Sequence, residues 1–243
     1  MTGTTLRYQA DGLSMAGEYH VDRNREGKRP GILVFPEIFG LSEHARTGAR
    51  RLAELGYAAL ACDLHGDARL VSGLDEAREL MAPVRENPAR IRARAQGALD
   101  ALLAQPDVDG RRIAAIGYCF GGTIALELAR GGADMVATVG FHSGLTTPAP
   151  EDAKNIRGKV LVCIGADDPG ITPEHRAAFE QEMRAAGVDW QLHLYGGVVH
   201  SFTNPAADAV GRPDFARYDA HADARSWAAM RLLFDEVFAE PAA

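Results

Sequence analysis

The lone thiol of Cys119 stands in a sequence context that suits a nucleophile. An apolar run over residues 113–116 ends at Gly117, and the pair Gly121-Gly122 is followed by small and aliphatic residues at helical spacing. This pattern predicts a strand, a tight turn and a helix, the arrangement of a nucleophile elbow. The glycines have a steric reason, because side chains at positions 117 and 121 would collide where strand and helix approach each other. The positive end of the helix dipole favours a thiolate at Cys119.

The alternative for any lone cysteine is packing in the core, where free thiols are common and inert. Cys62 and Cys163 fit that description because both lie inside apolar runs. Cys119 does not, since it lies between the expected strand and helix and is flanked by glycines. We therefore expect Cys119 to be the nucleophile and the other two thiols to be buried.

Two further reactive side chains follow expected strands later in the chain. An acid, Asp168 or its neighbour Asp167, comes after one apolar run, and His200 comes after another run and two glycines. Residues beyond the carboxyl ends of parallel strands share one edge of a sheet, so both groups are expected beside Cys119. There His200 would exchange a proton with the thiol and the acid would orient the imidazole. The alternatives are a carboxylate that stabilises a turn or caps a helix, and an exposed loop histidine.

Five other histidines lack such a context. We expect them at the surface, or for the last of them in a strand: His20, His44, His175, His221 and His193. An acidic run near the C-terminus resembles a set of metal ligands: Asp214, Asp219, His221 and Asp223. Carboxylates also gather in the first turns of helices, so we expect no metal there.

Apolar runs alternate with segments of helical periodicity, which predicts a mostly parallel sheet with helices on both faces. The expected strands cover residues 6–9, 14–21, 31–35, 57–62, 113–117, 135–141, 159–164 and 189–195. The expected helices cover residues 43–55, 74–84, 89–104, the segment after Cys119, 174–186 and 215–238. The first two strands form an antiparallel edge, and the rest alternate as βαβ units. No repeat or linker-like change of composition divides residues 1–243, so we expect one three-layer α/β domain.

The composition limits the partners and the compartment. A net charge of −7 over 243 residues argues against nucleic acid and anionic membranes as default partners. Residues 1–11 contain no basic segment followed by an apolar one, and no run reaches membrane-spanning length, so we expect a cytoplasmic protein. Three cysteines without a paired spacing argue against disulfides and a zinc site. We expect no cofactor, and a monomer or weak homodimer.

In these features the chain resembles the dienelactone hydrolase family, which are α/β hydrolases with a cysteine nucleophile. Four motifs carry the resemblance: Pro36-Glu37-Ile38-Phe39-Gly40, Gly117-Tyr118-Cys119-Phe120-Gly121-Gly122, Gly165-x-x-Asp168 with Ile171, and Tyr195-Gly196-Gly197-Val198-Val199-His200-Ser201-Phe202. The likeness extends from the first buried strand to the terminal helix. It implies the α/β-hydrolase fold and hydrolysis of small carboxylic esters or lactones, as by a carboxymethylenebutenolidase.

The resemblance also implies roles for individual residues. The triad would be Cys119, His200 and Asp168, because Asp168 and not Asp167 matches the family register. Glu37 would lie beside the thiol and govern its protonation as substrate enters. The alternative for Glu37 is an exposed carboxylate at the start of a helix.

Substrate recognition follows the family less closely. The oxyanion hole would be formed by the backbone N–H groups of Ile38 and Phe120. In the family, an Arg and a Tyr after the second buried strand hold the substrate carboxylate, and this sequence has no matching pair there. Arg78 lies in that segment, where it is either an anion ligand or a surface ion-pair partner. His142 and Phe141 stand where the family has aromatic pocket walls.

We therefore expect a hydrolase of esters or lactones that forms a thioester on Cys119. One alternative is a ligand-binding or regulatory module with an unreactive thiol, which rapid alkylation at neutral pH would argue against. The other is an acyltransferase on the same residues, which product analysis with competing nucleophiles would distinguish.

Overall fold

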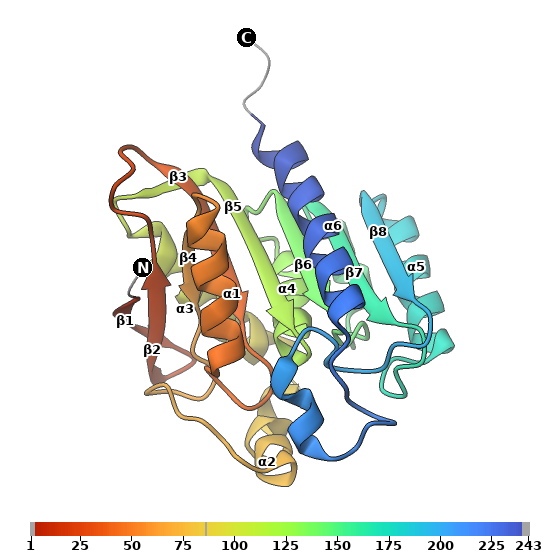
Figure 1. Cartoon of the computed structure of the whole chain (residues 1–243). Helices are drawn as coiled ribbons and strands as arrows, with labels where there is room; N and C mark the ends of the chain where they lie inside the picture. The colour runs from red at the N-terminus through yellow and green to blue at the C-terminus, as the bar shows by residue number, and fades with distance from the viewer. Residues whose placement is uncertain (1–2, 86, 240–243) are drawn as a thin grey trace.

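The computed structural model describes residues 3–85 and 87–239. At its centre lies an eight-stranded sheet, which helices cover on both faces (Figure 1). The strands are β1 (Thr4–Ala10), β2 (Leu13–His20), β3 (Arg29–Phe35), β4 (Ala58–Ala61), β5 (Val108–Tyr118), β6 (Ala137–Phe141), β7 (Lys159–Gly165) and β8 (Trp190–Tyr195). The helices are α1 (Glu43–Glu54), α2 (Leu74–Arg85), α3 (Pro88–Leu103), α4 (Phe120–Arg130), α5 (Pro173–Ala186) and α6 (Ala220–Phe238), with 3-10 turns η1 (Pro150–Asn155) and η2 (Pro205–Val210).

The sheet has the order β1-β2-β4-β3-β5-β6-β7-β8. Strands β1 and β2 pair antiparallel to each other, β2 pairs antiparallel to β4, and the remaining neighbours run parallel. Every residue of β3, β4 and β6 is buried, as expected of parallel strands covered on both faces. The predicted α/β class with an antiparallel edge is confirmed.

The two faces of the sheet carry different helices, which makes three layers (Figure 1). On one face α1 and α6 bury Leu52 and Phe234 against Ile116 of β5. On the other face α3 and α4 contribute Leu99 and Ile124 to a second apolar cluster. Among the described residues, no helix combines the length and the apolar character needed to cross a bilayer.

The terminal helix begins later than predicted. Its N-cap is Asp219, whose carboxylate accepts hydrogen bonds from the N–H groups of His221 and Ala222, so α6 starts at residue 220 and not 215. The preceding segment is held against the His200 loop instead, since the N–H of His200 donates to the carbonyl of Phe215 at 3.0 Å. This segment therefore becomes a wall of the cavity beside His200.

Candidate active site

Cys119 lies at the junction of β5 and α4, with a backbone φ of 54° and ψ of −119°. A Cβ atom added at Gly117 would lie 2.1 Å from the carbonyl oxygen of Gly121, and one added at Gly121 would lie 2.3 Å from the carbonyl oxygen of Phe35. The predicted steric need for both glycines is confirmed. Because strand and helix approach this closely, the chain turns sharply and presents Cys119 at the N-terminus of α4.

The three thiols differ in exposure. Cys62 and Cys163 are fully buried, and burial raises the pKa of Cys62 well above its ordinary value and that of Cys163 to about 12. Cys119 is half-buried and lines a cavity. Only Cys119 therefore combines contact with the cavity and a helix N-terminus.

His200 and Asp168 meet at this edge of the sheet. The Nδ1 of His200 lies 2.6 Å from Oδ2 of Asp168, whose side chain is buried. The other carboxylate oxygen of Asp168 accepts from the N–H of Gly170 at 2.8 Å. Asp167 is exposed, so the structure pairs Asp168 and not Asp167 with the imidazole.

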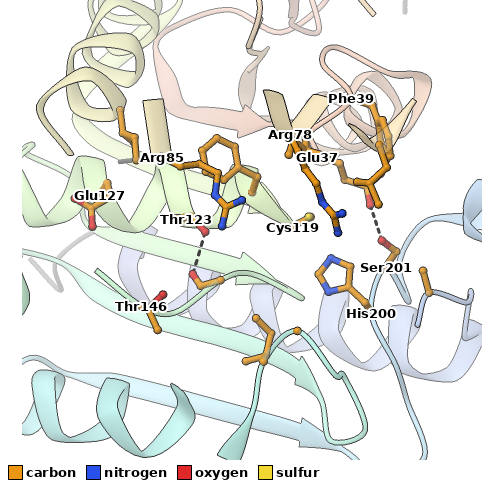
Figure 2. A pocket seen from close by; sticks show the side chains of 18 of the residues that line it. Glu37, Phe39, Arg78, Arg85, Cys119, Thr123, Glu127, Thr146, His200 and Ser201 are labelled. Atoms are coloured by element: carbon orange, nitrogen blue, oxygen red, sulfur yellow. Dashed lines mark hydrogen bonds between the residues drawn. The ribbon is translucent and has the colours of Figure 1, made fainter. Parts of the chain in front are cut away.

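Cys119 and Asp168 act together on the charge of His200. Burial by itself would lower the pKa of His200, but the adjacent Cys119 and the hydrogen bond to Asp168 raise it well above its ordinary value. Figure 2 shows the Cys119 sulfur facing the His200 ring. The arrangement therefore favours the protonated imidazolium of His200 beside the sulfur.

Glu37 is buried at the end of β3 and is not an exposed helix-start carboxylate. Its oxygens accept from Oγ of Ser201 at 3.0 Å and from Nδ2 of Asn204 at 2.6 Å. Burial would raise the pKa of Glu37, but the interaction with His44 and the positive charges of nearby imidazoles lower it to about 2. The carboxylate points toward Ser201 (Figure 2).

The two residues predicted to form the oxyanion hole both line the cavity. Phe120 is the first residue of α4, where backbone N–H groups have no acceptor within the helix. Ile38 follows Glu37, and its carbonyl accepts from Nε2 of His65 at 2.8 Å. That hydrogen bond anchors the Ile38 segment at the mouth of the site.

The cavity that these residues share has a volume of about 560 Å³. Its lining includes three arginines, Arg78 and Arg85 from α2 and Arg212 from the loop before α6, of which the sequence motifs indicated only Arg78. Figure 2 shows Arg78 beside Cys119 and Arg85 pointing toward Thr123. No motif marked Arg85 or Arg212. The sequence offered only a weak indication of them, namely cationic residues in segments of irregular pattern that follow a strand.

Phe141 and His142 do not form pocket walls, and that prediction is wrong. Both are buried behind the cavity, with Phe141 stacked on Tyr118 at 5.3 Å between ring centroids. Phe141 belongs to the apolar cluster on the face covered by α1 and α6, and His142, which follows β6 with a φ of 41°, packs on the rings of His200 and Phe202.

The prediction that His20 and His44 lie at the surface is also wrong. His20 is buried in β2, and the side chain of His44 is only 12% exposed. The sequence signal for His44 was its place in the first turn of α1, the next helix after Glu37.

Replacing His200 by Gln should shift the pH dependence of Cys119 alkylation. In the wild-type protein the reaction with iodoacetamide should extend to a lower pH than in His200→Gln, because a neighbouring imidazolium stabilises a thiolate; in His200→Gln the midpoint should approach about 8.5, the ordinary range of a thiol. Mass spectrometry of the Cys119 peptide measures the rates, and the exposed His221→Gln serves as the control. Identical profiles for wild type and His200→Gln would contradict the predicted pair.

Comparisons with known proteins agree with this architecture. The chain matches the model of the dienelactone hydrolase family over residues 17–238. It is 29% identical over 221 residues to a putative carboxymethylenebutenolidase of Methylorubrum extorquens, covering 82% of this chain and 76% of the relative. A solved structure titled m3DLH is 54% identical with a TM-score of 0.93, covering 97% of this chain and 98% of that one. The dienelactone hydrolase-like promiscuous phosphotriesterase P91 from metagenomic libraries is 49% identical with a TM-score of 0.93 and the same coverage. The chain therefore belongs to the dienelactone hydrolase family.

Proposed function

We propose that this protein hydrolyses small carboxylic esters or lactones through a thioester on Cys119. The observation that carries the proposal is a buried Asp168–His200 pair, 2.6 Å apart, whose imidazole faces a half-buried thiol that opens on a cavity of about 560 Å³ (Figure 2). The family to which the chain belongs supports the hydrolase class.

Acylation begins when the Cys119 thiolate attacks the carbonyl carbon of the substrate. The developing oxyanion accepts hydrogen bonds from the N–H groups of Ile38 and Phe120. Collapse of the tetrahedral intermediate breaks the bond to the alkoxide, which takes a proton from the imidazolium of His200. For a lactone the alcohol stays attached to the acyl group.

Deacylation uses the same groups in the opposite order. Neutral His200 removes a proton from a water molecule that attacks the thioester carbon, while Asp168 holds the Nδ1–H and stabilises the imidazolium that forms. The thiolate of Cys119 then leaves, and the carboxylic acid is released. The triad would act within one chain, in a monomer or weak homodimer.

The substrate that fits this cavity best carries an anionic group. Arg78, Arg85 and Arg212 line it, whereas the Glu127 carboxylate is compensated by Arg92 and Arg130 at 2.9 and 3.0 Å. A guanidinium binds a carboxylate with two hydrogen bonds, so an acid on the acyl portion would find a partner on α2. A reducing compartment such as the cytoplasm suits this chemistry, because the nucleophile must remain a free thiol.

A second candidate function is phosphotriester hydrolysis, favoured by the 49% identity to a promiscuous phosphotriesterase along nearly the whole chain. The Cys119 thiolate would attack phosphorus and expel an aryloxide. Water would then attack the phosphorus of the S-phosphoryl intermediate, regenerate the thiolate and release a dialkyl phosphate. This reaction uses the same nucleophile without an anionic substrate.

Substitution of the nucleophile should abolish ester turnover. We expect Cys119→Ala to lower kcat/KM for a panel of aryl esters and enol lactones by at least about 10³-fold, and Cys119→Ser to retain an intermediate rate. Cys163→Ala, which removes a buried thiol of the same size, is the control. Equal turnover by wild type and Cys119→Ala would refute the covalent route, and thioester transfer to added alcohols in place of water would indicate an acyltransferase.

The arginines should select for an acidic acyl group. We expect the ratio of kcat/KM for 4-nitrophenyl hydrogen adipate to that for 4-nitrophenyl hexanoate to fall about tenfold in Arg78→Gln, the equivalent of about 1.4 kcal/mol, and by less in Arg85→Gln. Arg184→Gln, which removes an exposed arginine on α5, should leave the ratio unchanged. If the ratio is the same in the wild type and the three variants, the arginines do not bind the acidic group of the substrate.

A neutral phosphotriester should behave differently. Diethyl 4-nitrophenyl phosphate should be hydrolysed by the wild-type protein, lose its turnover in Cys119→Ala and keep it within about twofold in Arg78→Gln, because the substrate carries no anion for the guanidinium to bind. Release of 4-nitrophenolate measures all three. Absence of turnover by the wild-type protein would remove this second function while leaving the ester proposal in place.

A further inference from the structure

Three imidazoles surround the buried carboxylate of Glu37. The ring centroids of His200 and His142 are 5.1 Å apart, and Nδ1 of His44 of α1 lies 3.7 Å from Oε2 of the carboxylate. Positive charge on any of the three lowers the pKa of Glu37. The proposed catalytic steps use only His200, so His44 and His142 need a separate explanation.

His44 is placed to act on Glu37. Its Nδ1 lies 3.7 Å from Oε2 of Glu37, beyond a direct hydrogen bond but close enough for an N–H on this nitrogen to interact favourably with the carboxylate at a buried site. The ring packs against Tyr118 at 4.2 Å between centroids. From α6, Asp223 also acts on this imidazole, and burial raises the pKa of Asp223, which weakens its competition with Glu37.

The other nitrogen of His44 belongs to a relay of hydrogen bonds. Nε2 lies 3.2 Å from Oγ1 of Thr203, and that oxygen lies 2.8 Å from Nε2 of His142. Burial lowers the pKa of His142 well below its ordinary value, and the charge of His200 adds to this effect. His142 is therefore neutral, and one of its nitrogens carries no proton.

The hydroxyl of Thr203 can accept a hydrogen bond from one imidazole and donate one to the other. Nδ1 of His142 is buried without a partner among the described residues, and an unpaired nitrogen lone pair costs less there than an unpaired N–H, so the proton belongs on Nε2. Nε2–H of His142 then donates to Thr203, and the hydroxyl of Thr203 donates to Nε2 of His44. With this direction, Nδ1 of His44, which also has no hydrogen-bond partner among the described residues, presents an N–H toward Oε2 of Glu37 at 3.7 Å.

We infer that His44 is a positioning residue that holds ionised Glu37 against Ser201 and Asn204 and away from the sulfur of Cys119, with its tautomer set by Thr203 and His142. The inference rests on the proposed function only in taking Cys119 as the reactive thiol. An ionised Glu37 that is free to turn toward the sulfur disfavours the thiolate, through like-charge repulsion or by accepting a hydrogen bond from the thiol. His44 thus keeps the nucleophile ionised before substrate arrives.

A double-mutant cycle on thiol reactivity tests this role independently of ester turnover. Alkylation of Cys119 by iodoacetamide is followed from pH 5 to pH 10 in wild type, His44→Leu, Glu37→Gln and the double variant. We expect His44→Leu to move the midpoint of the profile up by about one unit, a tenfold slower reaction below the midpoint, and to leave the rate at pH 10 unchanged. In the Glu37→Gln background the same substitution should produce no shift, because the carboxylate that His44 restrains is gone.

Three further variants separate positioning from packing. His44→Asn, whose amide can stand in for the Nδ1–H, should restore part of the wild-type midpoint, and Thr203→Val should shift it in the same direction as His44→Leu by a smaller amount. His221→Leu, at an exposed position, should have no effect. A His44→Leu shift that persists undiminished in the Glu37→Gln background, or no shift at all, would overturn the inference. If the midpoints behave as expected but no ester is hydrolysed, the proposed function fails and the role of His44 stands.

Discussion

The close approach of three backbone segments at the elbow is the constraint on which the site depends. Gly117, Gly121 and Phe35 come so near to one another that a single methyl group at either glycine would overlap a carbonyl oxygen. The contact lets α4 begin directly at the end of β5, with its first N–H groups beside the sulfur of Cys119. This geometry requires a positive φ at Cys119, which is an unfavourable backbone conformation. It is tolerated because the packing of the surrounding sheet and helix holds the chain in this turn.

The parallel sheet gathers the other reactive groups at the same edge. Glu37, Asp168 and His200 follow strands β3, β7 and β8. Strand β3 lies far from β7 and β8 in the chain, but all three end at the same edge of the sheet as β5 and β6 (Figure 1). The loops that bear these groups also line the cavity. Placement of the chemistry is thus a property of strand order, and the helices of both faces serve to hold that order.

Charge compensation explains how so many ionisable groups share one buried edge. Each carboxylate has a partner of its own, since Asp168 pairs with His200 and Glu37 is held by Ser201, Asn204 and the imidazole of His44. Burying a charge without such a partner would neutralise it or unfold the site. The cavity also carries arginines, of which Arg78 lies 3.8 Å from the exposed carboxylate of Asp75.

Residue order and local sterics were enough to predict the sheet, the elbow and the convergence of Cys119 and His200, because apolar periodicity and glycine requirements act over short stretches of chain. The choice of Asp168 over Asp167 needed the family register, and the structure pairs Asp168 with the imidazole. The burial of His44, the turn of Phe141 and His142 away from the cavity and the start of α6 at Ala220 were decided only by tertiary packing. Which way a side chain points at the end of a strand or helix depends on the neighbours that arrive from elsewhere in the chain, and those contacts leave no periodic trace in the sequence.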